Sequence, residues 1–310
     1  MQKLVLFISS FLFISLSFGQ KQETVNLNSK DSAINYYIAI IPESIPIKAF
    51  MFLLPGLGGT PQDILQQTDL PVYAAKQGIL VVMPVSSSGT LYFGIDNASQ
   101  QSLSDQINSV VSKYQLQGKD FYIGGFSIGG SCAVKYAELT VKNNTAIKPR
   151  AVFGIDPPLD FERYYNAAKR VTRLSVNMPV MQEIPFMIDK IEKEMKGTPK
   201  TALENFYNAS PYSFSDTTQR AVKNLTTIPI MLITEPDVQW WLSQRGYDYS
   251  FMNAIDQAAM INELHRLGNT KAVLITTNNK GYRKPNHTRH PHSMSIVESE
   301  QLVSWLLSQK

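Results

Sequence analysis

The residues best suited to chemistry in this 310-residue chain form the sequence G-F-S-I-G at positions 125–129. This stretch follows a predicted strand at 120–123, whose residues 121–123 are apolar, and it precedes a helical pattern at 131–139. A tight strand-to-helix turn lifts a serine side chain clear of the sheet, and it needs glycines where strand and helix approach closely. Ser127 is therefore the candidate nucleophile of an acyl-transfer reaction.

A serine nucleophile also needs backbone N–H groups that stabilise the oxyanion formed when it attacks a carbonyl. One candidate is the amide of Ile128, at the start of the predicted helix. The second is expected in the P-G-L-G-G loop at 55–59, where the glycines allow the amide of Leu57 to turn toward the substrate. No G-K-[ST] sequence follows this loop, so a phosphate-binding function is excluded.

The four histidines are the candidates for a general base. His265 lies within a predicted amphipathic helix, whereas the histidines at 287, 290 and 292 cluster between the last apolar run and the last predicted helix. These three share no helical face and have no carboxylate close by in the sequence. No metal site is therefore expected.

In order and spacing, the loop at 55–59, the serine turn at 125–129, the T-E-P-D turn at 234–237 and His292 resemble an α/β-hydrolase. The resemblance runs from residue 34 to the last helix. It implies a triad in the order serine, acid, histidine, with Asp237 as the acid and His292 as the base. Glu235 remains an alternative for the acid, and His290 remains an alternative for the base.

The apolar pattern predicts the elements that position these residues. Continuous apolar runs are typical of strands buried on both faces, and they lie at 49–54, 79–83, 121–123, 151–155, 228–233 and 272–275. Helical periodicity lies between them, at 102–114, 131–139, 258–267 and 296–307. This alternation predicts an α/β fold with a doubly wound, mostly parallel sheet, preceded by a strand pair at 25–28 and 34–41.

Residues 157–227 interrupt this rhythm, because about 70 residues between two strands is far longer than an ordinary connection. Helical patterns at 161–171 and 178–195 predict a helical lid inserted between late strands, with a flexible, Met-containing face over an apolar pocket. An ordinary packed helix pair is the alternative.

Two further groups of residues flank the predicted site. Trp240 and Trp241 follow the acid turn, and they are expected either to line the substrate pocket or to belong to the core under the lid. Basic residues at 280–289 could attract an acidic substrate, although a solvated loop is the preferred interpretation.

Composition limits the other functional classes. The chain is 44% hydrophobic and 17% charged, which is typical of a globular protein. Its formal net charge of +4 comes without a dense basic block, so no nucleic-acid partner is expected. A single cysteine, Cys132, excludes an internal disulfide and a Cys-based zinc site, and no cofactor is implied.

Residues 1–19 read as a signal peptide, with Lys3, an apolar stretch at 4–18, and small residues at 17 and 19. The apolar stretch is shorter than the ~20 residues needed to span a membrane, so no stable membrane insertion is expected after cleavage. The mature chain, residues 20–310, is then expected to be one α/β-hydrolase domain, secreted or periplasmic.

These features together predict an exported serine hydrolase that cleaves a small-molecule or polymer-linked carboxylic ester through an acyl-enzyme on Ser127. Two alternatives remain. The first is a serine peptidase or amidase, which would use the same triad. The second is a non-catalytic binding protein on a hydrolase scaffold, although a serine, an acid and a histidine in the expected order argue against it.

Overall fold

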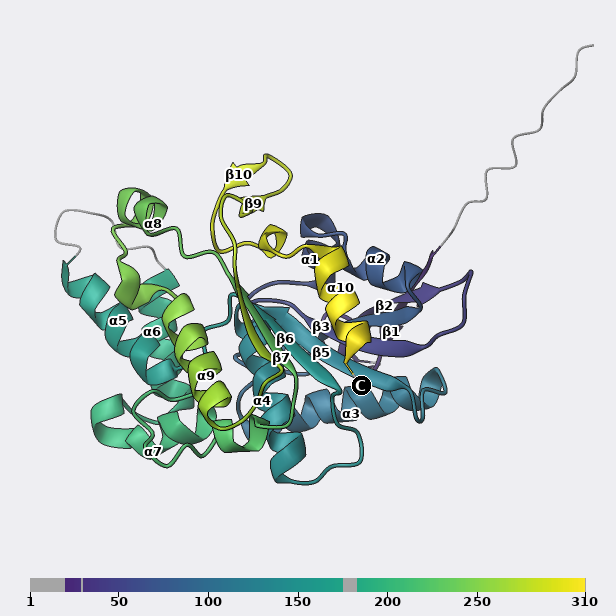
Figure 1. Cartoon of the computed structure of the whole chain (residues 1–310), viewed down its shortest axis with the longest axis horizontal. Helices are drawn as coiled ribbons and strands as arrows, with labels where there is room; N and C mark the ends of the chain where they lie inside the picture. Colours follow the sequence, from purple (N-terminus) through teal and green to yellow (C-terminus); the bar gives the residue numbers. More distant parts are fainter. Residues whose placement is uncertain (1–19, 29, 175–182, 310) are drawn as a thin grey trace, which may run out of the picture.

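The computed structural model of the chain describes residues 20–28, 30–174 and 183–309 (Figure 1). Within these residues the main sheet has eight strands. They are β1 (Gln20–Asn26), β2 (Tyr36–Pro42), β3 (Ala49–Leu54), β4 (Ile79–Val85), β5 (Asp120–Phe126), β6 (Ala151–Ile155), β7 (Ile230–Thr234) and β8 (Ala272–Thr276). A small hairpin is formed by β9 (Tyr282–Arg283) and β10 (Thr288–Arg289).

The strands of the main sheet stand in the order β1-β2-β4-β3-β5-β6-β7-β8. β2 pairs antiparallel with both β1 and β4. All pairs from β4 to β8 are parallel, which confirms the predicted mostly parallel sheet. Parallel strands end at one common edge, and the loops that leave this edge are where such a sheet positions functional side chains.

Helices cover both faces of the sheet, as expected for a doubly wound fold (Figure 1). They are α1 (Pro61–Gln67), α2 (Leu70–Lys76), α3 (Asn97–Lys113), α4 (Ile128–Lys142), α5 (Phe161–Leu174), α6 (Glu183–Glu194), α7 (Pro199–Ala209), α8 (Val238–Arg245), α9 (Ala254–Arg266) and α10 (Ser299–Ser308). Residues of α3, α4 and α9 share one apolar core with the sheet. Residues of α1, α2 and α10 share the other.

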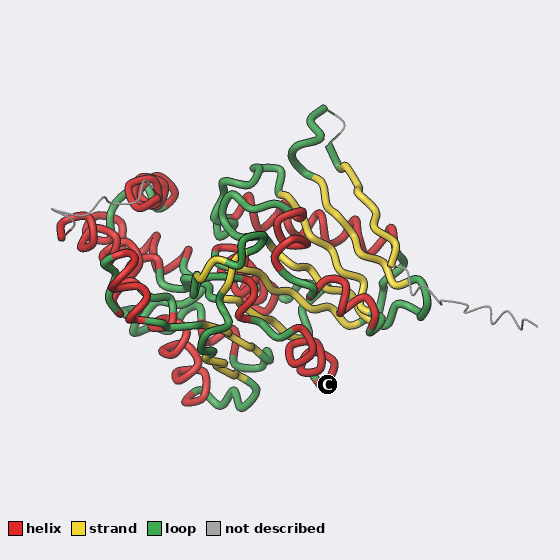
Figure 2. Tube along the Cα trace, turned by 90° about the horizontal axis from the view of Figure 1, so that it is seen from above, coloured by secondary structure: helices red, strands yellow, loops and turns green. Residues whose placement is uncertain are grey.

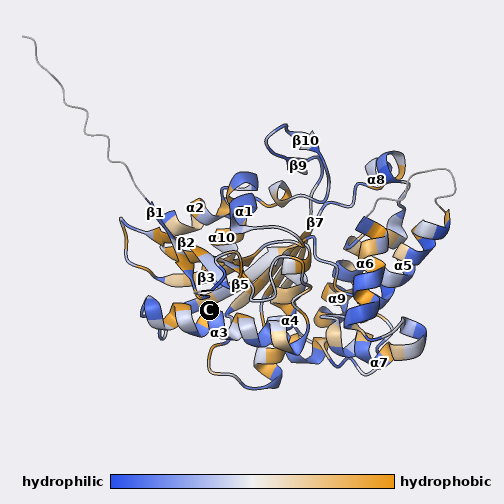
Figure 3. Cartoon of the chain, turned by 180° about the vertical axis from the view of Figure 1, so that it is seen from behind, coloured by the Kyte–Doolittle hydropathy of each residue, from blue (hydrophilic) through white to orange (hydrophobic). Residues whose placement is uncertain are grey.

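Strand β3 shows why the apolar runs were continuous rather than alternating. Phe50 and Phe52 belong to the core under α3, α4 and α9, whereas Met51 and Leu53 belong to the core under α1, α2 and α10. Successive side chains of a strand point to opposite faces, so a strand covered on both faces must be apolar at every position. Figure 3 shows hydrophobic residues gathered in the centre of the molecule and hydrophilic ones on the outward helix faces.

The segment between β6 and β7 contains α5, α6 and α7, of which α7 was not predicted. These helices lie to one side of the sheet in both Figure 1 and Figure 2. Phe161, Tyr165, Met187 and Phe206 are buried in a core that the three helices share. Residues 178–182 of the predicted second helix lie outside the described residues, and α6 begins at Glu183. The role of this segment as a lid stays a prediction.

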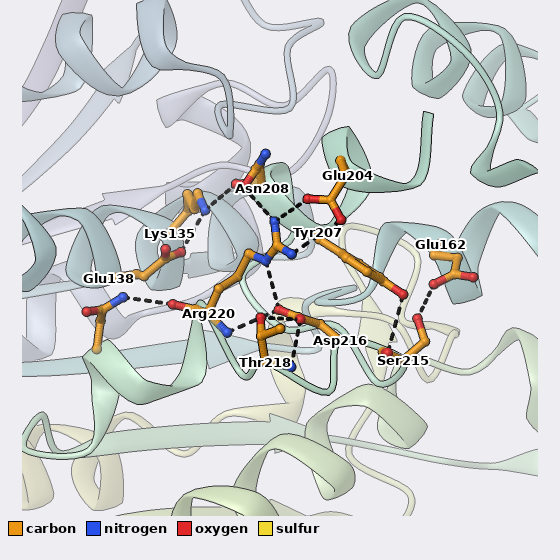
Figure 4. A network of polar contacts seen from close by, with 11 residues as sticks. Lys135, Glu138, Glu162, Glu204, Tyr207, Asn208, Ser215, Asp216, Thr218 and Arg220 are labelled. Atoms are coloured by element: carbon orange, nitrogen blue, oxygen red, sulfur yellow. Dashed lines mark hydrogen bonds and ion pairs between the residues drawn. The ribbon is translucent and has the colours of Figure 1, made fainter. Parts of the chain in front are cut away.

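A polar network fixes the far end of this segment to α4 (Figure 4). Buried Lys135 pairs with Glu138 at 2.7 Å and donates a hydrogen bond to the carbonyl oxygen of Asn208 at 2.6 Å. Arg220 donates to the Asn208 side chain at 3.1 Å and pairs with Glu204 at 2.8 Å. The charged atoms of Lys135 and Glu138 are thus compensated where α7 meets the sheet domain.

The predicted signal peptide, residues 1–19, lies outside the described residues. Among the helices that the structure does describe, none is both long enough and apolar enough to cross a membrane.

The crossing of β5, α4 and the loop after β3 is the tightest backbone contact near the predicted nucleophile. A Cβ atom at Gly125 would lie 2.5 Å from the carbonyl carbon of Gly129. A Cβ atom at Gly129 would lie 2.5 Å from the backbone oxygen of Leu54 and would also overlap that of Pro55. Only glycine fits at these two positions, which explains the G-x-S-x-G spacing.

Substitution of Gly129 by alanine tests this packing constraint. We expect Gly129→Ala to lower the free energy of unfolding by about 3 kcal/mol, because the obstructing oxygens belong to backbone that cannot move aside cheaply. Gly118→Ala is the matched control: Gly118 has a φ of +76° but open space around its Cβ position, so only backbone strain of about 1 kcal/mol is expected. Equal losses in urea unfolding would contradict the proposed overlap.

Candidate active site

Ser127 lies at the turn between β5 and α4, as predicted. Its φ of 52° and ψ of −126° are strained for a residue with a side chain. Its N–H donates to the carbonyl oxygen of Ile155 at 2.8 Å, which ties the turn to the end of the neighbouring strand β6. The backbone is therefore held in a shape that exposes Oγ above the edge of the sheet.

His292 lies in the loop between β8 and α10 and reaches both Ser127 and an acid. Its Nε2 is 3.0 Å from the Oγ of Ser127, and its Nδ1 is 2.6 Å from the Oδ2 of Asp156. The ring packs against Phe126, with 4.6 Å between the centroids. The carboxylate accepts from Nδ1–H, so Nε2 is left free to accept the serine proton.

Asp156, rather than Asp237, is the acid beside the histidine, and this placement corrects the sequence interpretation. Asp156 follows β6, the strand next to β5, and its φ is 49°. Its Oδ1 accepts from the hydroxyl of Thr234 at 2.6 Å and from Nε2 of Gln257 at 3.1 Å. With only 7% of its surface exposed, the carboxylate is oriented by three neighbours before any substrate binds.

The two acids of the T-E-P-D turn have other contacts. Asp237 accepts from the backbone N–H of Trp240 at the start of α8 and pairs with Arg289 at 2.7 Å. Glu235 is 3% exposed, pairs with Arg289 at 2.6 Å and accepts from the N–H of Lys280 at 2.8 Å. Both acids therefore hold the loop that carries His292. Of the three residues Thr234, Glu235 and Asp237 at the end of β7, Thr234 is the one whose side chain donates to Asp156. The end of β7 therefore supports His292 indirectly, through this hydrogen bond.

The two predicted oxyanion donors lie beside the serine. Leu57 and Ile128 line the same pocket as Ser127. The loop at 56–59 is braced by hydrogen bonds from the N–H groups of Gly58 and Gly59 to the carbonyl oxygens of Thr90 and Gly56, both 2.9 Å long. Ile128 opens α4, so its N–H lies at the positive end of a helix. The arrangement suits stabilisation of a negative oxygen next to Ser127.

The pocket in front of Ser127 has a largely apolar wall. Its aromatic and aliphatic lining comes from α5, α6, α8 and the segment that follows α8: Tyr164, Ile184, Met187, Trp241, Tyr247, Phe251 and Met252. Of the two tryptophans expected either to line the pocket or to belong to the core under the lid, Trp241 is a lining residue. Trp240 is not among the lining residues and packs edge-to-face against Trp241, with 4.9 Å between the ring centroids.

His290 lines this pocket without replacing His292. Its ring lies 4.9 Å from that of Trp240 and 5.5 Å from that of Trp241. Burial, followed by Coulombic interactions with Arg283, His292 and Arg245 that disfavour a protonated ring, lowers the pKa of His290 to about 3. Its Nδ1 is buried and has no hydrogen-bond partner among the described residues. His290 is therefore neutral at ordinary pH.

The remaining candidates are settled by their contacts. His265 Nε2 lies 2.6 Å from the carbonyl oxygen of Ala272, a structural contact between α9 and β8. In the part of the chain that the structure describes, no three His, Cys, Asp or Glu side chains lie together in a group that could hold a metal ion.

Sequence reasoning missed Thr234 and Gln257 as partners of the acid. The available signal for Asp156 was its position directly after an apolar strand at the edge that carries Ser127.

A pH-dependent stability measurement tests the state of His290. The ordinary histidine pKa of 6.5 applies to the unfolded chain, which therefore binds a proton below that pH while the folded protein does not. Stability present above pH 6.5 is thus lost on acidification. The free energy of unfolding of both proteins is measured at about pH 7.5 and about pH 5.5. We expect the decrease between these two pH values to be about 1 kcal/mol smaller in His290→Phe than in the wild type, because phenylalanine keeps the ring packing but does not bind a proton. Identical losses in urea unfolding of the two proteins would contradict a neutral, buried His290.

Comparison with known proteins gives structural neighbours but no close sequence relatives. No protein-family model matches the chain, and no curated protein matches it. The fold is similar to that of carboxyl esterase 2 from the mycorrhizal fungus Tuber melanosporum, at 14% identity and a TM-score of 0.57, covering 96% of this chain and 90% of that one. It is also similar to an S-formylglutathione hydrolase from Agrobacterium tumefaciens, at 11% identity and a TM-score of 0.58, covering 95% and 97%.

A third neighbour is a peptidase. The acylaminoacyl peptidase of Pyrococcus horikoshii matches at 13% identity and a TM-score of 0.54, over 86% of this chain but only 38% of the peptidase. At such low identities these likenesses establish architecture. Together with the strand order and the turn at Ser127, they show that this chain has the α/β-hydrolase fold.

Proposed function

We propose that this protein is a serine hydrolase that cleaves carboxylic esters through an acyl-enzyme on Ser127. The observation that carries the proposal is the continuous relay from the Oγ of Ser127 through His292 to Asp156, with contacts of 3.0 Å and 2.6 Å. Nucleophile, base and acid come from three separate segments of the chain, yet they meet in one hydrogen-bonded line at the edge of the sheet.

The first half-reaction follows from this geometry. The Oγ of Ser127 bonds to the ester carbonyl carbon while its proton passes to Nε2 of His292. The carboxylate of Asp156 stabilises the imidazolium, and the N–H groups of Leu57 and Ile128 stabilise the tetrahedral oxyanion. His292 then gives the proton to the leaving alkoxide, so the C–O bond breaks and an alcohol departs.

Water completes the cycle. His292 accepts a proton from the water that attacks the acyl-enzyme, and it returns this proton to Oγ as the carboxylic acid leaves. No step requires a cofactor. The composition of residues 1–19 supports export before the enzyme acts, with a small-molecule or polymer-linked ester as substrate.

A peptidase or amidase activity is the second candidate, favoured by the likeness to the acylaminoacyl peptidase. The same relay would serve an amide, so the two activities are separated by substrate. Comparison of kcat/KM on an aryl ester and on the matching anilide distinguishes them. The proposal expects the ester to be strongly preferred, and comparable or faster anilide cleavage would favour the peptidase alternative.

Covalent labelling tests the nucleophile. We expect a fluorophosphonate probe to label the wild-type protein and the Cys132→Ala variant, because Cys132 is buried and plays no part in the relay. Ser127→Ala should abolish labelling, because the attacking oxygen is gone. Folded wild-type protein that fails to react, or Ser127→Ala that still reacts, would overturn the proposal.

A paired substitution tests the acid. Asp156→Asn should lower kcat/KM about 10³–10⁴-fold, because an amide no longer favours the histidine tautomer that accepts the serine proton. Asp237→Asn is the matched control, and its effect should stay within about ten-fold, because Asp237 caps α8 and pairs with Arg289 instead. Circular dichroism of both variants checks folding. The opposite ranking would return the role of the acid to Asp237.

A further inference from the structure

Two arginines line the pocket of Ser127 without a carboxylate partner. They are Arg245, at the end of α8, and Arg283, at the end of β9. Within the described residues neither forms an ion pair within 4.0 Å. The Nε atom of Arg245 is buried and has no hydrogen-bond partner there. Leaving a buried N–H group of a cation unpaired is costly, so the guanidinium of Arg245 is not fully satisfied by the described residues.

The neighbouring cations are different. Lys280 pairs with Glu298 at 2.8 Å, and Arg289 pairs with both Glu235 and Asp237. Among the described residues, the Arg283 side chain donates a hydrogen bond to the backbone oxygen of His292, at 3.0 Å, and to no other group; Arg283 is exposed and lines the pocket. The cations of the basic loop at 280–289 therefore differ. Acids outside the loop neutralise Lys280 and Arg289. Within the described residues Arg283 and Lys284 form no ion pair, and of these two Arg283 lines the pocket.

The two arginines also act on the same spot. Arg283 and Arg245 line the same pocket as His290, and both contribute to the lowered pKa of His290. Two like charges at one pocket repel each other, and an anion between them would relieve this repulsion. Arginine is well suited to such an anion because its planar fork can bind a carboxylate through two parallel hydrogen bonds.

Three acids also line the pocket. Asp156 is paired with His292 and Glu235 with Arg289, so Glu183 is the one that must be considered further. Glu183, at the start of α6, is exposed and is not within 4.0 Å of either arginine as an ion pair in the described structure. The charged pocket residues without an ion pair in the described structure are Arg245, Arg283 and Glu183, and the formal charge of these three is positive. A substrate with a negative group would meet two favourable charges and one unfavourable charge, whereas a cationic substrate would meet the reverse.

We propose that the preferred ester carries a carboxylate, which Arg245 and Arg283 bind while the ester carbonyl lies at Ser127. This inference rests on the proposed function and specifies its substrate class. The aromatic wall formed by Trp241, Tyr247 and Phe251 contacts the apolar part of such a substrate. The substrate is thus amphipathic, with a hydrophobic body and one anionic end.

Matched esters test this preference. On the acyl side, p-nitrophenyl half-esters of succinate, glutarate and adipate are compared with neutral p-nitrophenyl esters of the same chain length. On the alcohol side, the acetate of 4-hydroxybenzoate is compared with that of 4-methylphenol. The readout is the ratio of kcat/KM for the anionic ester to that for its neutral counterpart. We expect this ratio to exceed about ten in at least one series. The ester with the highest ratio shows on which side of the ester bond, and at what distance from it, the carboxylate is bound.

Charge variants connect the preference to the two arginines. Arg245→Met and Arg283→Met keep an unbranched side chain and remove the cation, so each should lower the ratio by about ten-fold or more. Glu183→Gln should raise it, because it removes a repulsive charge. Arg266→Met is the matched control: Arg266 is exposed on α9 and does not line the pocket, so the ratio should stay at the wild-type value.

The outcomes separate this inference from the proposed function. If Ser127 is labelled and neutral esters are cleaved, but the ratio is near or below one, the carboxylate preference is overturned and the hydrolase proposal stands. A high ratio that survives both Arg→Met substitutions overturns the assignment to these arginines. If the protein neither reacts with a fluorophosphonate nor cleaves any ester, the proposed function fails and this inference falls with it.

Discussion

The hydrogen bond between His292 and Asp156 is the interaction on which the active-site arrangement depends. It joins residues that are 136 positions apart in the chain, at 2.6 Å. Ser127, at the end of β5, can use the histidine as a base only if the ring is held in one orientation and one tautomer. Asp156 does this from the end of β6, and because β6 lies directly beside β5, the proposed acid and the proposed nucleophile are held at one edge of the sheet.

The surrounding residues stabilise this bond from several sides. Thr234 and Gln257 hold the second oxygen of Asp156, so its carboxylate has little freedom to turn. The buried carboxylate of Glu235 accepts backbone hydrogen bonds within the loop that carries His292 and pairs with Arg289. The T-E-P-D turn thus contributes to the site, but its acids position a loop rather than the imidazole.

The sequence allowed most of the fold and two of the three relay residues, Ser127 and His292, to be predicted. Continuous apolar runs indicated the parallel strands, because strands covered on both faces are apolar at every position. Ser127 could be predicted because tight backbone packing demands glycine at fixed offsets on either side of it. His292 was expected from its place before the last helix. The apolar runs, the glycines around Ser127 and the position of His292 before the last helix are patterns over short stretches of chain, so they can be recognised in the sequence alone.

The acid could not be chosen in the same way, because each of several acids follows a strand at the same edge of the sheet. Choosing among them needs the three-dimensional path of the turn after β6, where Asp156 has a φ of 49° and points back toward His292. The arginines of the basic loop could not be told apart from the sequence either. Arg283 and Arg289 are alike in a basic loop, and only their partners distinguish a pocket cation from a neutralised one.

The central claim, that Ser127 carries the acyl group during turnover, can be tested most directly by mass spectrometry. Wild-type protein turning over an aryl ester is quenched in acid, digested and mapped by peptide. The account predicts an acyl adduct on the peptide that contains Ser127, at that residue, and its loss in Ser127→Ala. Turnover without any adduct on this peptide, or with the adduct on Cys132, would contradict it.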